Sequence, residues 1–164
     1  RVLFRSLNNI SVAKGEALFV PAGMPHAYLS GLGVEIMLAS DNVLRGGLTP
    51  KHIDVDELSK VLVFQSGEVG TVAQQKLASG LSKFDIPVGE FSFYHLNLNS
   101  TKMLIDLEQP GDAILICIGG SVVISNSLGE RETVGLGEAV YISSDASTFS
   151  LTGSGEAYLA VSLG

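Results

Sequence analysis

The chain has 164 residues, of which 46% are hydrophobic and 16% charged, with 19 glycines, so it has enough apolar material to bury the core of a globular domain. Its net charge of −7, with only ten Lys and Arg, disfavours a nucleic-acid partner, and we expect none. No window approaches the roughly 18 apolar residues of a membrane span, so we expect no membrane segment.

The first residues, RVLFRSLNNI, contain neither a long apolar stretch nor an initial methionine. We therefore interpret Arg1 as a cut end, and we expect a cytoplasmic protein because nothing indicates secretion. The single cysteine, Cys117, lies in the apolar run AILICIG, where a buried and unreactive thiol is the expected state.

Short runs in which apolar residues alternate with other residues dominate the chain, and Gly, Pro or Asn bound them, as in an all-β sandwich or barrel. They lie at 10–12, 17–19, 103–107, 113–117, 122–124 and 140–142. One segment is helical instead. Asp54 and Glu57 have the spacing of a capping box and apolar residues follow at helical intervals, which predicts a helix over about 54–63. Residues 65–83 show no firm period and are expected to form an irregular connector.

An internal repeat relates the beginning of the chain to its end. GEALFVPAGMPHAYLSG, residues 15–31, aligns without gaps with GEAVYISSDASTFSLTG, residues 137–153. Both copies begin with Gly-Glu-Ala, continue with three apolar residues and end with Ser or Thr before Gly. Thr148 occupies in the second copy the place of His26 in the first. The repeat predicts two related β units, of which only the first keeps the histidine.

The first copy presents His26 from a stiff corner. Pro21 fixes its own φ, Gly23 permits a turn that a Cβ would obstruct, and Pro25 restrains its neighbours. A metal ligand held in this way loses its conformational entropy during folding and not during metal capture. A good hairpin turn with a histidine nearby is an equally good interpretation of this motif alone.

Further metal ligands are scarce. A zinc site needs three or four nitrogen, sulfur or carboxylate ligands, and the chain has three histidines with no His-x-His pair. We expect His52 and His95 to be solvated or hydrogen-bonded. Either His26 binds no metal, or its partner ligands lie upstream of Arg1.

The Gly-x5-Pro-x-Gly-x2-His pattern around His26 resembles the second conserved motif of the cupin superfamily. The next stretch, HAYLSGLGVEIMLASDNVLRGGLTPK at 26–51, resembles the second signature of type I mannose-6-phosphate isomerase, a zinc-dependent family built on cupin barrels. Only Leu38 and Gly46 depart from it, since alanine is usual at both places. The resemblance continues more weakly to the C-terminus, so the chain resembles the last two fifths of a family member. It implies an all-β fold of cupin-like jelly-roll barrels with one short helix between the two repeats.

The resemblance also implies an activity, the interconversion of mannose 6-phosphate and fructose 6-phosphate through an enediol with one zinc ion per full-length chain. It implies that His26 is a zinc ligand and that the remaining ligands lie upstream of this chain. Arg45 corresponds to the residue usually assigned as catalytic, and its forked cation suits an enediolate or phosphate oxygen.

Four further residues are predicted to bind the sugar phosphate, each with a simpler alternative. Tyr28 shares the face of His26 on an extended strand, but it is equally well interpreted as a core aromatic. Glu35 lies among apolar residues, which favours a pocket over an outward strand face. Asp41 is alternatively part of an Asx turn that shapes the arginine loop, and Lys51 a solvated charge.

We expect three parts. Residues 1–51 are the C-terminal strands of the metal-binding barrel with the signature loop, 52–83 a helical and irregular connector, and 84–164 a second, degenerate and metal-free barrel. The fragment alone is expected to be inactive and to pack against the missing N-terminal part of the enzyme. The alternative is a stand-alone double-cupin module that binds a small ligand or a protein without catalysis.

Overall fold

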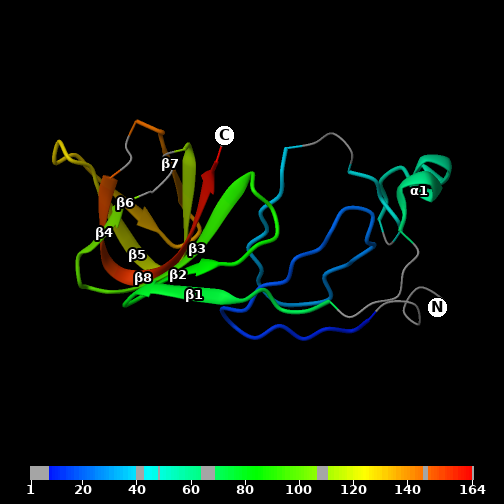
Figure 1. Ribbon diagram of the computed structural model, residues 1–164, viewed down its shortest axis with the longest axis horizontal. Coiled ribbons are helices and arrows are strands. Elements are labelled where there is room, and N and C mark those ends of the chain that lie inside the picture. Colours follow the sequence, from blue (N-terminus) through cyan, green and yellow to red (C-terminus); the bar gives the residue numbers. More distant parts are fainter. Residues whose placement is uncertain are drawn as a thin grey trace. The chain divides into compact units, whose positions relative to one another are not determined.

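The computed structural model describes residues 8–39, 43–47, 49–63, 69–106, 111–145 and 148–163. Its internal contacts divide the chain into an N-terminal unit, Arg1–Thr71, and a C-terminal unit, Val72–Gly164. Figure 1 shows that strands dominate these described residues, which also include one short helix; this confirms the predicted all-β class. No helix in the described part of the chain has the length and apolar character needed to cross a membrane.

The C-terminal unit contains all the named strands. They are β1 (Gln74–Ala78), β2 (Leu81–Phe84), β3 (Phe91–Asn99), β4 (Met103–Asp106), β5 (Ala113–Ser125), β6 (Arg131–Gly135), β7 (Ala139–Ile142) and β8 (Thr148–Ser162). Every strand pairing among them is antiparallel.

Two long strands, β5 and β8, pair with each other along most of their length and connect two layers. Residues 113–117 of β5 and 154–162 of β8 lie in a wide layer, whose order is β1-β2-β3-β8-β5-β7. Residues 121–125 of β5 and 148–154 of β8 lie in a narrow layer, whose order is β4-β8-β5-β6. The two layers therefore share their central strands.

Glycines allow both long strands to bend between the layers. Gly120 has φ +65° and Gly153 has φ +121°, values that side chains rarely adopt. A Cβ on Gly120 would overlap the carbonyl oxygen of Ser154, and one on Gly153 would overlap that of Ser121. The pairing of the two strands also shifts by one residue between Cys117 and Gly119.

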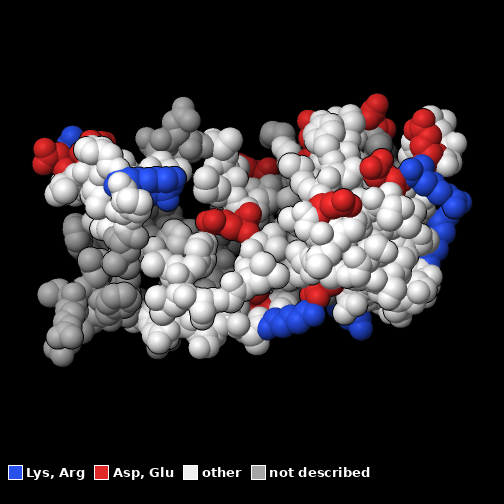
Figure 2. Space-filling view, turned by 180° about the vertical axis from the view of Figure 1, so that it is seen from behind, with Lys and Arg blue, Asp and Glu red and all other residues white. Residues whose placement is uncertain are grey.

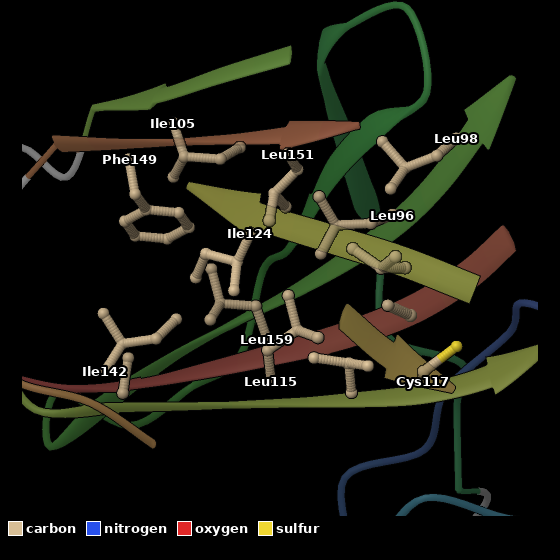
Figure 3. Close-up of a cluster of buried hydrophobic side chains, with 14 of the residues drawn as sticks. Leu96, Leu98, Ile105, Leu115, Cys117, Ile124, Ile142, Phe149, Leu151 and Leu159 are labelled. Atoms are coloured by element: carbon tan, nitrogen blue, oxygen red, sulfur yellow. The ribbon is translucent and has the colours of Figure 1, made fainter. Parts of the chain in front are cut away.

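The core lies between the layers, and alternate residues of each strand supply it (Figure 3). Leu115, Leu151 and Leu159 are fully buried at its centre. Cys117 is fully buried too, and its thiol faces the carbonyl oxygens of Gly119 and Gly120, which confirms the expected buried thiol. The full cluster is Leu96, Leu98, Ile105, Ala113, Leu115, Cys117, Val122, Ile124, Val134, Ile142, Phe149, Leu151, Ala157, Leu159 and Val161.

The expectation of an irregular segment over 65–83 was wrong for residues 74–78 and 81–83, which lie in β1 and β2. The sequence QQKLA of β1 is exposed along its whole length and pairs only with β2. An exposed edge strand needs no alternation of apolar residues, because backbone hydrogen bonds alone can hold it. Its pattern therefore gave no strand signal.

The N-terminal unit has little regular structure among its described residues. Its helix α1 (Val55–Val61) begins where predicted, since Asp54 caps it by accepting a hydrogen bond from the N–H of Glu57 at 2.9 Å. It ends two residues earlier than predicted, because Leu62 has extended backbone angles. No described residue of this unit is buried.

The predicted repeat is visible in backbone geometry. Gly15 and Gly137 have nearly the same positive φ, +84° and +80°. In both copies the following glutamate folds back on its own turn: Glu16 accepts from the N–H of Ala13, and Glu138 from that of Gly135, at 2.8 Å each. The same turn is thus built twice, once in each unit.

Candidate functional site

The corner before His26 is built as the sequence predicted. The N–H of Met24 donates to the carbonyl oxygen of Pro21, and Gly23 has φ +81°. A Cβ on Gly23 would lie 2.7 Å from the carbonyl oxygen of Val61, and the N–H of Val63 donates to the Gly23 carbonyl at 3.0 Å. The end of α1 therefore holds this corner in place.

His26 is exposed, and one of its ring nitrogens already has a partner. Its Nδ1 lies 3.2 Å from the carbonyl oxygen of Met24. A carbonyl can only accept, so this contact requires the tautomer with its proton on Nδ1. The lone pair of Nε2 then remains available, which is the arrangement of a histidine prepared to bind a metal.

Tyr28 lies beside this histidine and bonds in turn to Glu35. The rings of His26 and Tyr28 meet edge to face, with centroids 5.8 Å apart. Tyr28 donates a side-chain hydrogen bond to Glu35. Partial burial of the hydroxyl raises the pKa of Tyr28, and the charge of Glu35 and their hydrogen bond raise it further. The structure thus brings three of the predicted site residues together.

The other predicted residues are less closely associated. Arg45 and Lys51 are exposed. The hydrogen bonds of the described residues do not connect either of them to His26, Tyr28 or Glu35. The backbone N–H of Lys51 donates to the hydroxyl of Thr49, which shapes the Thr-Pro-Lys turn. Asp41 lies outside the described residues. Figure 2 shows the acidic and basic side chains of one face in small separate groups.

The donors of this chain fit a zinc ion only in part. His26 offers one suitable nitrogen, but within the described ranges no three His, Cys, Asp or Glu side chains lie close enough together to hold a metal. Among the described residues, the donor set is therefore too small for a tetrahedral zinc site.

A second polar pair was not anticipated. Nε2 of His95 lies 2.9 Å from Oε1 of Glu156, both side chains are mostly buried, and the His95 ring stacks on Tyr158 at 4.9 Å. The expectation that His95 is hydrogen-bonded is confirmed. Glu156 could not be found in advance, since only strand register brings it beside a residue so distant in sequence.

Comparison with known proteins gives a consistent result. The chain is 38% identical to the mannose-6-phosphate isomerase of Salmonella typhimurium and 35% identical to that of Escherichia coli, over 91% of its own length in each case. It is 41% identical to a probable mannose-6-phosphate isomerase of Dictyostelium discoideum over 73% of its length. The chain spans only 38% of the length of the two bacterial relatives, and no family model matches it.

Solved structures of phosphomannose isomerase from Salmonella typhimurium are similar in fold. They include three single-residue variants in which a glutamate, an arginine or a histidine is replaced by alanine. Their TM-scores are 0.63, 0.62 and 0.61, their identities are 34%, 33% and 33%, and each match covers about three quarters of this chain and a third of the other.

The antiparallel layers and these structural matches define a cupin-fold protein. Within that class, the chain belongs to the mannose-6-phosphate isomerase family and corresponds to its C-terminal part.

Proposed function

We propose that this chain is the C-terminal part of an enzyme that interconverts mannose 6-phosphate and fructose 6-phosphate. The observation that carries the proposal is the 38% identity to a mannose-6-phosphate isomerase over 91% of the chain, including the stretch that holds His26, Tyr28 and Glu35. Because the chain spans 38% of that relative, the proposed activity is that of the full-length protein.

The variant structures of the relative support the choice of residues. The histidine, glutamate and arginine replaced in them are separated along that chain by the same intervals as His26, Glu35 and Arg45 in this one. Three of the proposed site residues thus fall at the spacing of positions that were singled out for substitution in the relative.

His26 would be one ligand of a zinc ion, through Nε2, with the other ligands supplied upstream of this chain. A zinc ion bound there would polarise substrate oxygens and stabilise negative charge on them. The Met24 carbonyl holds the His26 ring in the required tautomer before any metal binds. Since α1 fixes the corner, little further ordering is needed.

Arg45 would be the catalytic cation. Moving a proton between C1 and C2 of the sugar leaves negative charge on the oxygens of an enediolate, and a guanidinium can donate two parallel hydrogen bonds to such oxygens. Its position just before Gly46 and Gly47 leaves the side chain exposed and able to reach a ligand.

Tyr28, Glu35, Asp41 and Lys51 would bind the substrate. The hydroxyl of Tyr28 fixes the Glu35 carboxylate, which leaves that carboxylate with free lone pairs for sugar hydroxyls. Lys51 supplies a positive charge for the phosphate in a chain whose net charge is −7. We place the enzyme in the cytoplasm, as for an enzyme of sugar-phosphate metabolism.

The N-terminal unit would complete its barrel with residues that precede this chain. Its described residues include large exposed side chains such as Leu29, Leu32 and Met37, at 66%, 83% and 60% exposure. A folded domain rarely leaves so much apolar surface uncovered. This supports the division proposed from the sequence, in which 1–51 belongs to the metal-binding barrel, 52–83 connects, and 84–164 forms the degenerate barrel. A stand-alone binding module is less well supported, because the relatives described above are all isomerases.

The experiment uses the full-length protein that contains this chain. We expect it to convert mannose 6-phosphate to fructose 6-phosphate in a coupled assay and to hold one zinc ion. His26→Ala should remove both zinc and activity, whereas Thr148→Ala, at the equivalent place in the second repeat, should leave both unchanged.

An inactive full-length protein that retains zinc, or a His26→Ala variant with parental zinc content and rate, would exclude this function.

A further inference from the structure

A continuous part of the outer surface of the wide layer is apolar, although one face of an exposed antiparallel sheet is normally polar. Leu115 and Cys117 of β5 point into the core, so Ile114 and Ile116 face outward. By the same alternation Tyr158 and Ala160 of β8 face outward. We call this surface the outer face; it comprises Phe84, Phe93, Ile114, Ile116, Tyr141, Tyr158 and Ala160.

Strand register joins these residues into continuous rows. Tyr141 pairs with Ile114, Ile114 with Ala160, and Ala160 with Phe93. In the next row, Ile116 pairs with Tyr158. Tyr158 and Phe93 also stack, with ring centroids 5.4 Å apart. The outer face is therefore one apolar surface and not a set of scattered side chains.

The narrow layer provides an internal comparison. Val122 and Ile124 of β5 point into the core, which directs Ser121, Val123 and Ser125 outward. Ser150 and Thr152 of β8 and Thr133 of β6 are outward in the same way. Together with the apolar side chains of Val123 and Leu104, these hydroxyl side chains make the outward surface of the narrow layer mixed, whereas the rows of the outer face named above are apolar.

Two sets of polar groups on this side of the wide layer are already paired. His95 and Glu156 bond to each other at 2.9 Å. The hydroxyl of Tyr141 donates to Asp112, which also accepts the N–H of Ser144 at 3.0 Å and so holds the tyrosine ring in place. Covering this surface would leave these hydrogen bonds in place.

Part of the outer face remains open. Phe84 and Phe93 are 1% and 7% exposed, but Ile114 is 55% and Tyr141 62% exposed. These two residues lie side by side on β5 and β7. An open apolar surface rimmed by paired polar groups is typical of a protein interface.

We propose that the open part of the outer face, centred on Ile114 and Tyr141, docks against the N-terminal part of the full-length protein. We choose the N-terminal part as the partner of this surface because the matched sequence covers 38% of the bacterial relatives and corresponds to their C-terminal part. Most of such a protein therefore lies outside this chain and is covalently joined to it, at a high effective concentration. The inference depends on family membership and not on the reaction proposed above.

The test is hydroxyl-radical footprinting of the full-length protein, with oxidation of each side chain divided by its intrinsic reactivity. Leu128 is the reference, since it is 84% exposed at the tip of the hairpin between β5 and β6. In this chain alone Tyr141 and Leu128 have similar exposure, so we expect Tyr141 to oxidise at least tenfold more slowly than Leu128 in the full-length protein. The protection should not change with protein concentration.

A paired variant provides a second measurement. Ile114→Glu should abolish the protection of Tyr141, whereas Leu128→Glu should leave it intact. Equal oxidation of Tyr141 and Leu128 in the parent protein would show that water covers the outer face, and the proposal would be wrong. Protection that appears only at high protein concentration would assign the surface to a second copy of the protein and would equally reject the proposal. Neither outcome depends on whether the protein is an isomerase.

Discussion

Among single residues, Arg45 offers the sharpest distinction between a catalytic and a structural role. In the full-length enzyme, Arg45→Lys keeps the positive charge but loses the planar fork that donates two hydrogen bonds to an oxyanion. We expect kcat to fall on the order of a hundredfold or more. Zinc content and thermal stability should hardly change, because the side chain is exposed and the substitution leaves its glycine loop intact.

Arg131→Lys, at an exposed arginine of β6, is the matched control and should retain parental kinetics. If Arg45→Lys stays within about threefold of the parent kcat with zinc bound, electrostatic catalysis by Arg45 is refuted. If activity falls only because zinc is lost, Arg45 has a structural role.

A second residue-scale prediction concerns Asp112 and Tyr141. The hydrogen bond from Tyr141, and then that from the N–H of Ser144, lower the pKa of Asp112. A lowered pKa means that the unfolded chain takes up protons first as the pH falls. The stabilisation is therefore present above the unfolded pKa, about 3.9, and is lost as the pH falls through the lower folded value.

Tyr141→Phe should thus destabilise the chain at pH 6, and the difference from the parent should shrink towards pH 2. Urea denaturation at several pH values measures this difference. In an Asp112→Ala background, where the acceptor is gone, Tyr141→Phe should have almost no further effect. A difference that stays constant across the acid range would show that the bond does not involve an ionised Asp112.

Among the elements, the bend shared by β5 and β8 makes the clearest prediction. Gly120→Ala forces a side chain into a left-handed backbone conformation and against the Ser154 carbonyl. We expect the free energy of unfolding to fall by at least about 2 kcal/mol. The neighbouring Gly119→Ala is the control, since its Cβ would sit 3.7 Å from that of Glu156, an ordinary contact. Equal urea midpoints for the two variants would contradict this account of the bend.

The elements also show what sequence reasoning can reach. The helix was predictable because Asp54 carries its own capping signal, and the Gly23 corner because proline and glycine act on the backbone directly. Spacing and an isolated charge predicted that Tyr28 and Glu35 belong with His26, and the structure joins Tyr28 to both; their role in substrate binding stays a prediction. The strand β1 gave no signal because it is polar at an edge, and Glu156 gave none because its partner His95 is reached only through strand register. Capping and turn rules therefore predicted structure formed by residues close in sequence, whereas pairs of residues far apart in sequence became visible only in the folded structure.

For the molecule as a whole, we predict that the 164-residue chain binds zinc weakly or not at all. One fixed imidazole cannot provide a tetrahedral shell, and a full-length protein would add the remaining ligands. The measurement is the metal content of the purified chain after dialysis against zinc-free buffer. Stoichiometric zinc with His26 among three or more ligands from this chain would show that the site is complete here, contrary to the proposed division of the enzyme.

The sharing of β5 and β8 between the two layers has a genetic consequence. Because β8 is central in both layers, neither layer can persist as a smaller folded remnant after β8 is lost. A premature stop codon anywhere in residues 148–161 would remove part of this common strand together with core residues such as Leu159 or Val161. Truncated alleles of this kind should behave alike, as complete losses of the C-terminal unit, and not as a graded series.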